Sequence, residues 1–232
     1  MKIAMVADLH GNLPAVEALD RDLARRGIKH IYCLGDMIGK GPSSADTMDW
    51  ALSKCEIILQ GNWDGGIGFK EFPADEFYYN QLGEKRMKIL RELPKEHVMT
   101  LSGRKTRLIH GRPTMPRPIP IHDGRSELEP YFLPDFEVLG YADVHTQGVR
   151  IVNHRGTLFN TGSVGNAIGS TYVQYCIVEA GGTREDPLDI TMVSLSYDNA
   201  RAAEDARLAG EKGLVNWELF IREVMTGHYA RK

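Results

Sequence analysis

Residues 1–12 read MKIAMVADLHGN, and this stretch decides the fold class. The apolar run over residues 3–7 predicts a short β-strand, because it has the length of a strand and polar residues end it abruptly. Asp8 and His10 follow at once. The first strand of the chain therefore ends in a carboxylate and an imidazole, two groups that can carry chemistry.

The sequence that follows alternates helices with short strands. Asn12 is a favourable helix cap, and the predicted order from there is a helix at residues 13–26, a strand at 30–34, a helix from Ser43 or Ser44 to about residue 54, and a strand at 56–60. Such alternation indicates a parallel sheet with helices packed on its faces. Ligands bind these sheets at the carboxyl ends of the strands, where Asp8, Asp36 and Asn62 lie.

The remainder of the chain has a different pattern. We predict a helix at residues 80–93, a strand at 106–109 that ends at His110, a strand at 136–140 that leads to Asp143 and His145, antiparallel strands between 149 and 195, and helices at 199–209 and 215–225. The proline-rich stretch predicts a loop or cap over residues 112–135. Because no convincing linker interrupts the sequence, we expect one domain over residues 1–232.

The composition is that of an ordinary globular protein. Of the 232 residues, 42% are hydrophobic and 25% are charged, and the formal net charge of −3 makes long nucleic acid an unfavourable partner. The three cysteines, Cys33, Cys55 and Cys176, are widely spaced and do not suggest a disulfide framework. We find no signal peptide and no stretch of membrane-spanning length, so we expect a cytoplasmic protein without a membrane partner.

Side chains that can bind metal ions follow most of the predicted strands. They are Asp8, His10, Asp36, Asn62, His110, Asp143 and His145. Mixed nitrogen and oxygen donors suit borderline metals such as Mn, Fe or Zn. Because one ion takes about four to six ligands, this set is large enough for two ions that share a bridging carboxylate.

Six short motifs occur at these strand ends. They read Asp8-Leu9-His10, Gly35-Asp36-Met37-Ile38-Gly39-Lys40-Gly41-Pro42, Gly61-Asn62-Trp63-Asp64, His110-Gly111, Ala142-Asp143-Val144-His145 and Asn160-Thr161-Gly162-Ser163. Each motif alone is weak, but together and in this order they resemble the calcineurin-like metallophosphoesterase superfamily, particularly its small bacterial and archaeal phosphodiesterase branch. The resemblance implies an α/β fold with two packed mixed β-sheets flanked by helices, a four-layer α-β-β-α sandwich.

The resemblance also implies a reaction and its cofactors. A small phosphorylated substrate, with nucleotides included, would be hydrolysed as a phosphate monoester or diester by in-line attack of a metal-bridging hydroxide. Two divalent ions are implied, with Mn favoured and Fe, Ni, Zn or Mg as alternatives. Asp36 and Asn62 are the implied catalytic residues. The implied ligands are Asp8, His10 and His145 for one ion, Asn62, His110 and Asp143 for the second, and Asp36 as the bridge.

Residues beside the motifs are candidates for contact with the substrate, namely Lys40, Trp63 and Arg112. Trp63 stands where active relatives often carry a histidine that protonates the leaving group, and an indole cannot act as that acid. We interpret Trp63 as a wall of the site and Asp64 as a residue that orients metal ligands from behind. Asp143 is a second departure, because the family has an imidazole there.

A scaffold protein is the alternative interpretation of the same sequence. Some proteins that share this fold, such as the retromer subunit of the superfamily, bind other proteins and have lost catalysis. The intact motifs around Asp8, Asp36 and Asn62 count against this, since a scaffold has little reason to bury like charges together. The glycines of residues 61–68 do not predict a Rossmann-type cradle. The last predicted helix has the apolar spacing of a core helix, with a homodimer contact as its alternative.

Overall fold

The computed structural model describes residues 1–72 and 75–231, and two five-stranded β-sheets form its centre. The sheets have the strand orders β10-β9-β1-β2-β3 and β4-β5-β6-β8-β7. The strands are β1 (Lys2–Val6), β2 (His30–Cys33), β3 (Ile57–Ile58), β4 (Glu96–Leu101), β5 (Arg104–Ile109), β6 (Val138–Tyr141), β7 (Gly148–Val152), β8 (Gly156–Asn160), β9 (Val173–Ala180) and β10 (Leu188–Leu195). The helices are α1 (Leu13–Arg25), α2 (Ser44–Lys54), α3 (Asn62–Gly68), α4 (Glu76–Glu92), α5 (Arg125–Leu128), α6 (Asn199–Gly210) and α7 (Trp217–Thr226), with a 3-10 turn η1 (Glu129–Phe132).

The first sheet contains the predicted strand and helix alternation. β1 pairs in parallel with β2, and β2 with β3, so these three strands end at the same edge. After Lys2, β1 is apolar, and both of its faces are covered. Ala4 and Val6 pack with the helices, whereas Ile3 and Met5 face the second sheet. The sequence places β9 far from β1, but the two strands pair antiparallel, with Lys2 opposite Glu179.

The second sheet corrects one expectation. The strands predicted between residues 149 and 195 do form two antiparallel hairpins, β7–β8 and β9–β10. However, β8 and β9 belong to different sheets, and β8 also pairs in parallel with β6. The chain crosses the sandwich between β8 and β9, and a local alternation of apolar residues carries no information about such a crossing.

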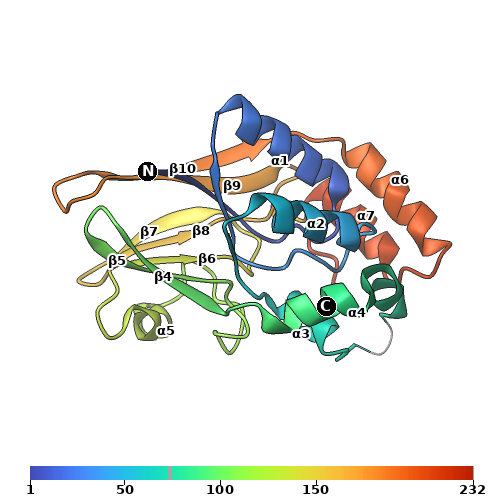
Figure 1. The fold of residues 1–232 in the computed structure, drawn as a ribbon, viewed down its shortest axis with the longest axis horizontal. Coiled ribbons are helices and arrows are strands. Elements are labelled where there is room, and N and C mark those ends of the chain that lie inside the picture. Colours follow the sequence, from blue (N-terminus) through green and yellow to red (C-terminus); the bar gives the residue numbers. More distant parts are fainter. Residues whose placement is uncertain (73–74, 232) are drawn as a thin grey trace.

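Four layers stack as predicted (Figure 1). Helices α1 and α2 cover the outer face of the first sheet. Side chains from both sheets, including Met5, Leu34, Leu108 and Phe159, form the core between them. The segment with α5 and η1 packs on the outer face of the second sheet through buried residues such as Phe132. The α-β-β-α sandwich is therefore confirmed.

Helix α3 is a feature that the sequence does not predict. It begins at Asn62 and contains three glycines in seven residues, which is unfavourable for an isolated helix. Packing against α4 accommodates it, because a Cβ at Gly68 would lie only 3.2 Å from Cβ of Leu90. The glycines let the helix lie against its neighbours, and the helix brings Asn62 and Asp64 to the sheet edge.

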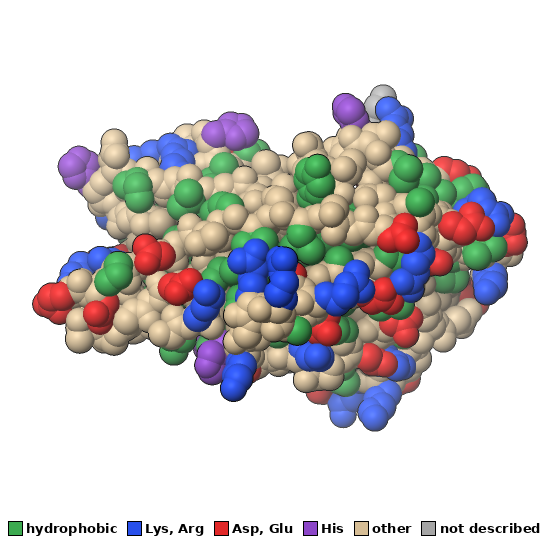
Figure 2. Space-filling model, turned by 90° about the horizontal axis from the view of Figure 1, so that it is seen from above, with side chains coloured by type: hydrophobic (Ala, Val, Ile, Leu, Met, Phe, Trp, Pro, Cys, Tyr) green, Lys and Arg blue, Asp and Glu red, His purple; other side chains and the backbone are tan. Residues whose placement is uncertain are grey.

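The closing helices α6 and α7 form at the predicted positions. Phe220 and Val224 of α7 are buried with Ala206 of α6, so this apolar face is core. Figure 2 shows the face that carries α1, where Lys and Arg side chains gather over the centre with acidic side chains among them. Ion pairs such as Arg201–Glu17, at 2.6 Å, join the elements there. Across residues 1–72 and 75–231, every helix is too short or too polar to cross a bilayer.

Candidate metal centre

The carboxyl ends of the parallel strands meet at one edge of the sandwich and carry the predicted ligands there. Asp8 follows β1, Asp36 follows β2, and His110 directly follows β5. These residues are at most 1% exposed. His145 follows β6 and is 4% exposed. Residues that are far apart in the sequence therefore share one buried position.

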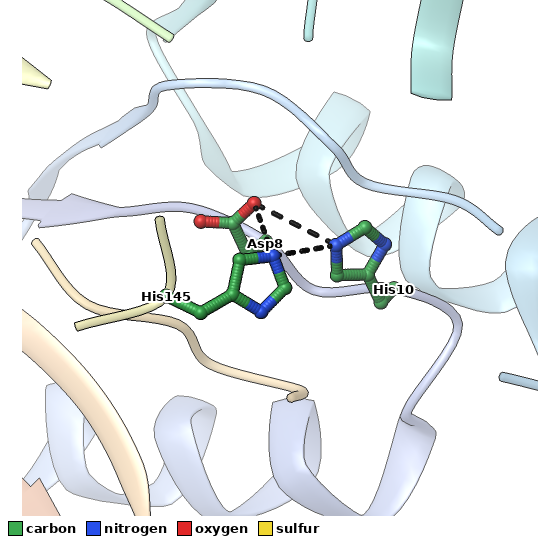
Figure 3. Close-up of side chains that lie close together, drawn as sticks. All are labelled: Asp8, His10 and His145. Carbon is green, nitrogen blue, oxygen red and sulfur yellow. Dashed lines mark hydrogen bonds and ion pairs between the residues drawn. The ribbon is translucent and has the colours of Figure 1, made fainter. Parts of the chain in front are cut away.

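One cluster consists of Asp8, His10 and His145 (Figure 3). The Nε2 atoms of the two histidines are 3.1 Å apart. Asp8 Oδ1 lies 3.6 Å from Nε2 of His10 and 3.3 Å from Nε2 of His145. Three atoms that can bind a metal ion therefore lie close enough together to share one ion.

A second cluster consists of Asp8, Asp36 and His110. His110 Nε2 lies 3.4 Å from Asp36 Oδ2 and 3.8 Å from Asp8 Oδ1. Asp36 Oδ2 is also 3.7 Å from Nε2 of His10. Both carboxylates therefore stand between the two clusters, so the arrangement offers donors to two neighbouring positions.

Backbone carbonyl groups fix all three histidine rings. Nδ1 of His10 lies 3.1 Å from the carbonyl oxygen of Ile38, Nδ1 of His110 lies 2.8 Å from that of Leu34, and Nδ1 of His145 lies 2.5 Å from that of Asn166. A carbonyl oxygen can only accept, so each Nδ1 carries the proton. Each Nε2 is then left with a lone pair for a metal ion when the ring is neutral.

Several buried polar atoms of these clusters and of Asn62 lack a hydrogen-bond partner within the described residues. Both carboxylate oxygens of Asp8, Oδ1 of Asn62 and Nε2 of His110 have no hydrogen-bond partner within the described part of the chain. An unsatisfied buried polar atom is costly, and native proteins rarely keep one without a reason. Oxygen and imidazole donors of this kind are the ligands of borderline divalent metals. The residues present therefore fit metal ions.

The backbone is strained at the same residues. Asp8, His10, Asp36 and His145 have φ angles of 54°, 46°, 54° and 56°. Residues other than glycine rarely adopt this left-handed conformation, and it is found preferentially at functional sites. Hydrogen bonds between the loops hold it, such as that from the Asp8 amide to the Gly35 carbonyl at 2.9 Å.

The buried charges perturb one another. Burial lowers the pKa of His10 well below its usual range, and the positive charge of Lys40 lowers it further. Burial also acts to lower the pKa of His110, but the carboxylates of Asp36 and Asp8 outweigh this and raise it to about 10. Two carboxylates buried together thus require a compensating positive charge, which a proton or a metal ion can supply.

Asp64 lies next to the clusters and binds the backbone of the loops that carry their residues. Its carboxylate accepts hydrogen bonds from the backbone N–H groups of Asp36 at 2.7 Å, Met37 at 3.1 Å and Gly61 at 3.0 Å. It therefore ties the loop after β2 to the start of α3. Asp36 itself accepts a hydrogen bond from the Trp63 amide at 2.8 Å, which fixes its carboxylate.

Asp143 and Arg112 lie beside the centre rather than within the clusters. Arg112 Nη2 donates to Asp143 Oδ1 at 2.6 Å, and its Nε and backbone N–H groups also donate to this carboxylate. The structure thus brings together most of the predicted ligands, whereas it commits the Asp143 carboxylate to Arg112. A metal-binding role for Asp143 stays a prediction.

A cavity of about 600 Å³ opens beside the centre. All three predicted substrate contacts, Lys40, Trp63 and Arg112, line it. Trp63 packs edge-on against His10, with ring centroids 5.9 Å apart, and a Cβ at Gly39 would lie 2.3 Å from its indole ring. The indole therefore forms a fixed wall.

Several residues that line the cavity were missed from the sequence. They are Phe72, Asp75, Pro118, Pro120, Val144, Ile168, Tyr229 and Arg231. The two prolines belong to the predicted cap, where a proline-rich loop was already a signal. Tyr229 and Arg231 follow the last helix, and Gly227 after that helix signals only that the chain turns, without its direction.

Comparison with known proteins gives matches over most of the chain. A family model described as the calcineurin-like phosphoesterase superfamily domain matches residues 1–182. An uncharacterised protein of Methanocaldococcus jannaschii is 27% identical over 237 residues, which covers 87% of this chain and 90% of that protein. A metallophosphoesterase from Sphaerobacter thermophilus has a TM-score of 0.77 and 21% identity, covering 98% of this chain and 99% of its own. An archaeal phosphodiesterase has a TM-score of 0.52 and 16% identity, covering 84% of this chain and 100% of its own. These two structural similarities show the shared fold.

Proposed function

Because the chain belongs to the calcineurin-like phosphoesterase superfamily, we propose that it hydrolyses a phosphate monoester or diester of a small compound with two bound divalent metal ions. One observation carries the proposal. Donor atoms of Asp8, Asn62 and His110 are buried without hydrogen-bond partners in the described residues, and they lie where the parallel strands end. Burying such atoms is unfavourable unless a ligand satisfies them.

The proposed ligands form two groups. Asp8, His10 and His145 would hold one ion, Asn62 and His110 the second, with Asp36 between them and Asp143 as a further candidate for the second ion. Mixed N and O donors favour Mn²⁺, with Fe, Ni, Zn and Mg as alternatives. When bound, the ions would supply positive charge to the transferring phosphoryl group and a water of lowered pKa.

The chain's own groups prepare this chemistry. Carbonyl tethers hold the three imidazole rings, so little reorganisation is needed when an ion binds. Lys40 and Arg112 present positive charge to the cavity in which a phosphate ester would lie. Trp63 offers a flat apolar wall to the rest of the substrate.

The test uses chelator-treated protein reloaded separately with Mn²⁺, Fe²⁺, Ni²⁺, Zn²⁺ or Mg²⁺. We expect metal-dependent hydrolysis of p-nitrophenyl phosphate or of bis(p-nitrophenyl) phosphate, and a loss of about 100-fold or more in Asp8→Asn. Asp46→Asn, which makes the same change on an exposed side chain of α2, is the matched control. Reloaded wild-type protein that binds metal but hydrolyses neither ester would support the scaffold interpretation instead.

A further inference from the structure

The segment after α7 returns to the cavity. Gly227 has a left-handed φ of 70°, and its carbonyl accepts a hydrogen bond from the Gly169 amide at 2.8 Å. The amide of Ala230 then donates to Glu223 Oε1 at 3.1 Å. These contacts place Tyr229 and Arg231 on the cavity wall, although the sequence separates them widely from the metal centre.

Within the described residues, Nε is the one nitrogen of the Arg231 guanidinium that has a hydrogen-bond partner. Its Nε donates to Glu223 Oε2 at 3.2 Å, and the two side chains are 14% and 2% exposed. Its Nη2 group is buried and has no acceptor among residues 1–72 and 75–231. A guanidinium is a rigid fork of five N–H donors. Nη2 is enclosed beside Nε, and no hydrogen bond joins Nη1 to the described residues, so the donors of Nη1 are the ones available to an acceptor in the cavity that Arg231 lines.

A buried network connects Arg231 with the metal centre. Glu223 Oε2 also accepts a hydrogen bond from Asn166 Nδ2 at 3.1 Å. Asn166 Oδ1 accepts from Lys40 Nζ at 3.2 Å, and Lys40 Nζ lies 3.3 Å from His145 Nε2. Because Lys40, Asn166 and Glu223 are each at most 6% exposed, the guanidinium is fixed relative to the centre, several side chains away from it.

No acid that lines the cavity is hydrogen-bonded to this guanidinium within the described residues. Three acids line the cavity, Asp36, Asp75 and Asp143. Asp36 belongs to the metal centre and Asp143 is paired with Arg112. Burial raises the pKa of Asp75 and the charge of Arg231 acts to lower it, so the two side chains lie within electrostatic reach, but within the described residues no hydrogen bond joins them. An anionic group of a ligand in the cavity would accept charge-assisted hydrogen bonds from the Nη1 donors of Arg231.

We propose that Arg231 forms an anion subsite for a second charged group of the substrate, a phosphate or a carboxylate, set several bonds from the phosphate that is hydrolysed. The proposal rests on the proposed function, because it takes the metal centre as the position of the scissile phosphate. A cavity of about 600 Å³ accommodates more than a phosphate group. Phe72 and Tyr229 supply apolar wall for the part of the substrate between its two charged ends.

The test measures binding of ligands that cannot be hydrolysed to the Mn²⁺-loaded protein. Calorimetry compares two series of compounds with alkylphosphonates of the same length. In the ω-phosphonocarboxylates and the α,ω-bisphosphonates, about two to five carbons separate the two charged groups. We expect one phosphonocarboxylate or one bisphosphonate to bind at least about 10-fold more tightly than the alkylphosphonate of the same length. The series that shows the gain identifies the second group as carboxylate or phosphate.

Arg231→Ala should abolish that gain and bind the alkylphosphonates as the wild type does, which also shows that the variant is folded. Arg222→Ala removes the same charge from the exposed side of α7 and should keep the gain. The proposal is overturned if no second group improves binding to the wild type, or if the improvement survives in Arg231→Ala. Hydrolysis of phenyl phosphate by the wild type reports on the proposed function separately, because that ester has no second charged group.

Discussion

The carboxylate of Asp143 is clamped by the guanidinium of Arg112, with both Nε and Nη2 donating to it and the shortest contact at 2.6 Å. The loops that carry them follow β5 and β6, which are parallel neighbours. Asp143 is almost fully buried, whereas the Arg112 side chain is 37% exposed beside the cavity. The pair therefore suits a role in which Asp143 orients Arg112 toward a ligand.

The first prediction concerns this pair. We expect Asp143→Asn to raise the KM for an aryl phosphate by about 10-fold, because Arg112 loses the ion pair that orients it. If this is the sole role of Asp143, the variant keeps its metal content. Elemental analysis and steady-state kinetics measure the two effects. Asp123→Asn breaks an exposed pair with Arg117 and serves as the control. Loss of one ion per chain in Asp143→Asn would instead assign Asp143 to the metal centre.

The second prediction concerns Asp36, the proposed bridge. Asp36→Asn should lower the metal content from about two ions per chain, because the carboxylate charge would serve both ions. In the wild type, Mn²⁺ should raise the melting temperature, since an ion that binds only the folded state stabilises it. This gain should shrink in Asp36→Asn. Unchanged metal content in the variant would contradict the dinuclear centre.

The third prediction concerns the leaving group. Because Trp63 occupies the position of a general acid, it cannot protonate an alkoxide leaving group. General acid catalysis typically raises the rate by ~10²–10⁴-fold. Rates on an aryl phosphate should therefore far exceed those on an alkyl phosphate, and Trp63→His should narrow the gap. Similar wild-type rates on the two esters would show that another group supplies the proton.

The fourth prediction concerns stability away from the centre. Asp22 on α1 is 5% exposed and accepts hydrogen bonds from Tyr175 Oη at 2.6 Å and from Arg26 and Arg25. Burial acts to raise the pKa of Asp22, but these donors outweigh it and hold the pKa below its ordinary value. The stabilisation is therefore complete above the pKa of the unfolded chain, about 3.9, and is lost as the pH falls through the lower pKa of the folded state.

Asp22→Asn should accordingly reduce the free energy of unfolding at pH 7 by about 1.5–3 kcal/mol. The difference from the wild type should shrink below about pH 3.9. Urea denaturation at several pH values measures it, with the exposed Asp189→Asn of β10 as the control. A deficit that stays constant down to pH 2 would mean that packing, rather than the charge of Asp22, carries the effect.

The sequence could predict that Asp8, Asp36 and Asn62 lie together because β1, β2 and β3 are parallel and end at one edge of their sheet. That rule turns three separate motifs into one location. It says little about loops. The ion pair of Arg112 with Asp143 depends on the conformations of two loops, and the return of Arg231 to the cavity depends on a turn at Gly227. Neither leaves a periodic signal.

Helix α3 shows a second limit. Its glycines lower helix propensity, so local reasoning favours a turn after Asn62. The close approach of Gly68 to Leu90 of α4 is a tertiary contact, which local propensities do not include. The alternation of strands and helices in the first sheet was predictable from apolar runs and their spacing, and the two-sheet sandwich was implied by the resemblance of the motifs. This short helix depends on contacts that form only once the chain has folded.

The pairing of β1 with β9 has a consequence during synthesis on the ribosome. Lys2 lies opposite Glu179, so one edge of β1 has no strand to pair with until β9 has been translated. Until then the nascent β1 and β2 can pair while the other edge of β1 stays open, and this strand is apolar on both faces. Open apolar edges recruit other chains. Stalled or truncated products that end before residue 173 should therefore aggregate or require a chaperone, and supplying β9 and β10 should restore solubility.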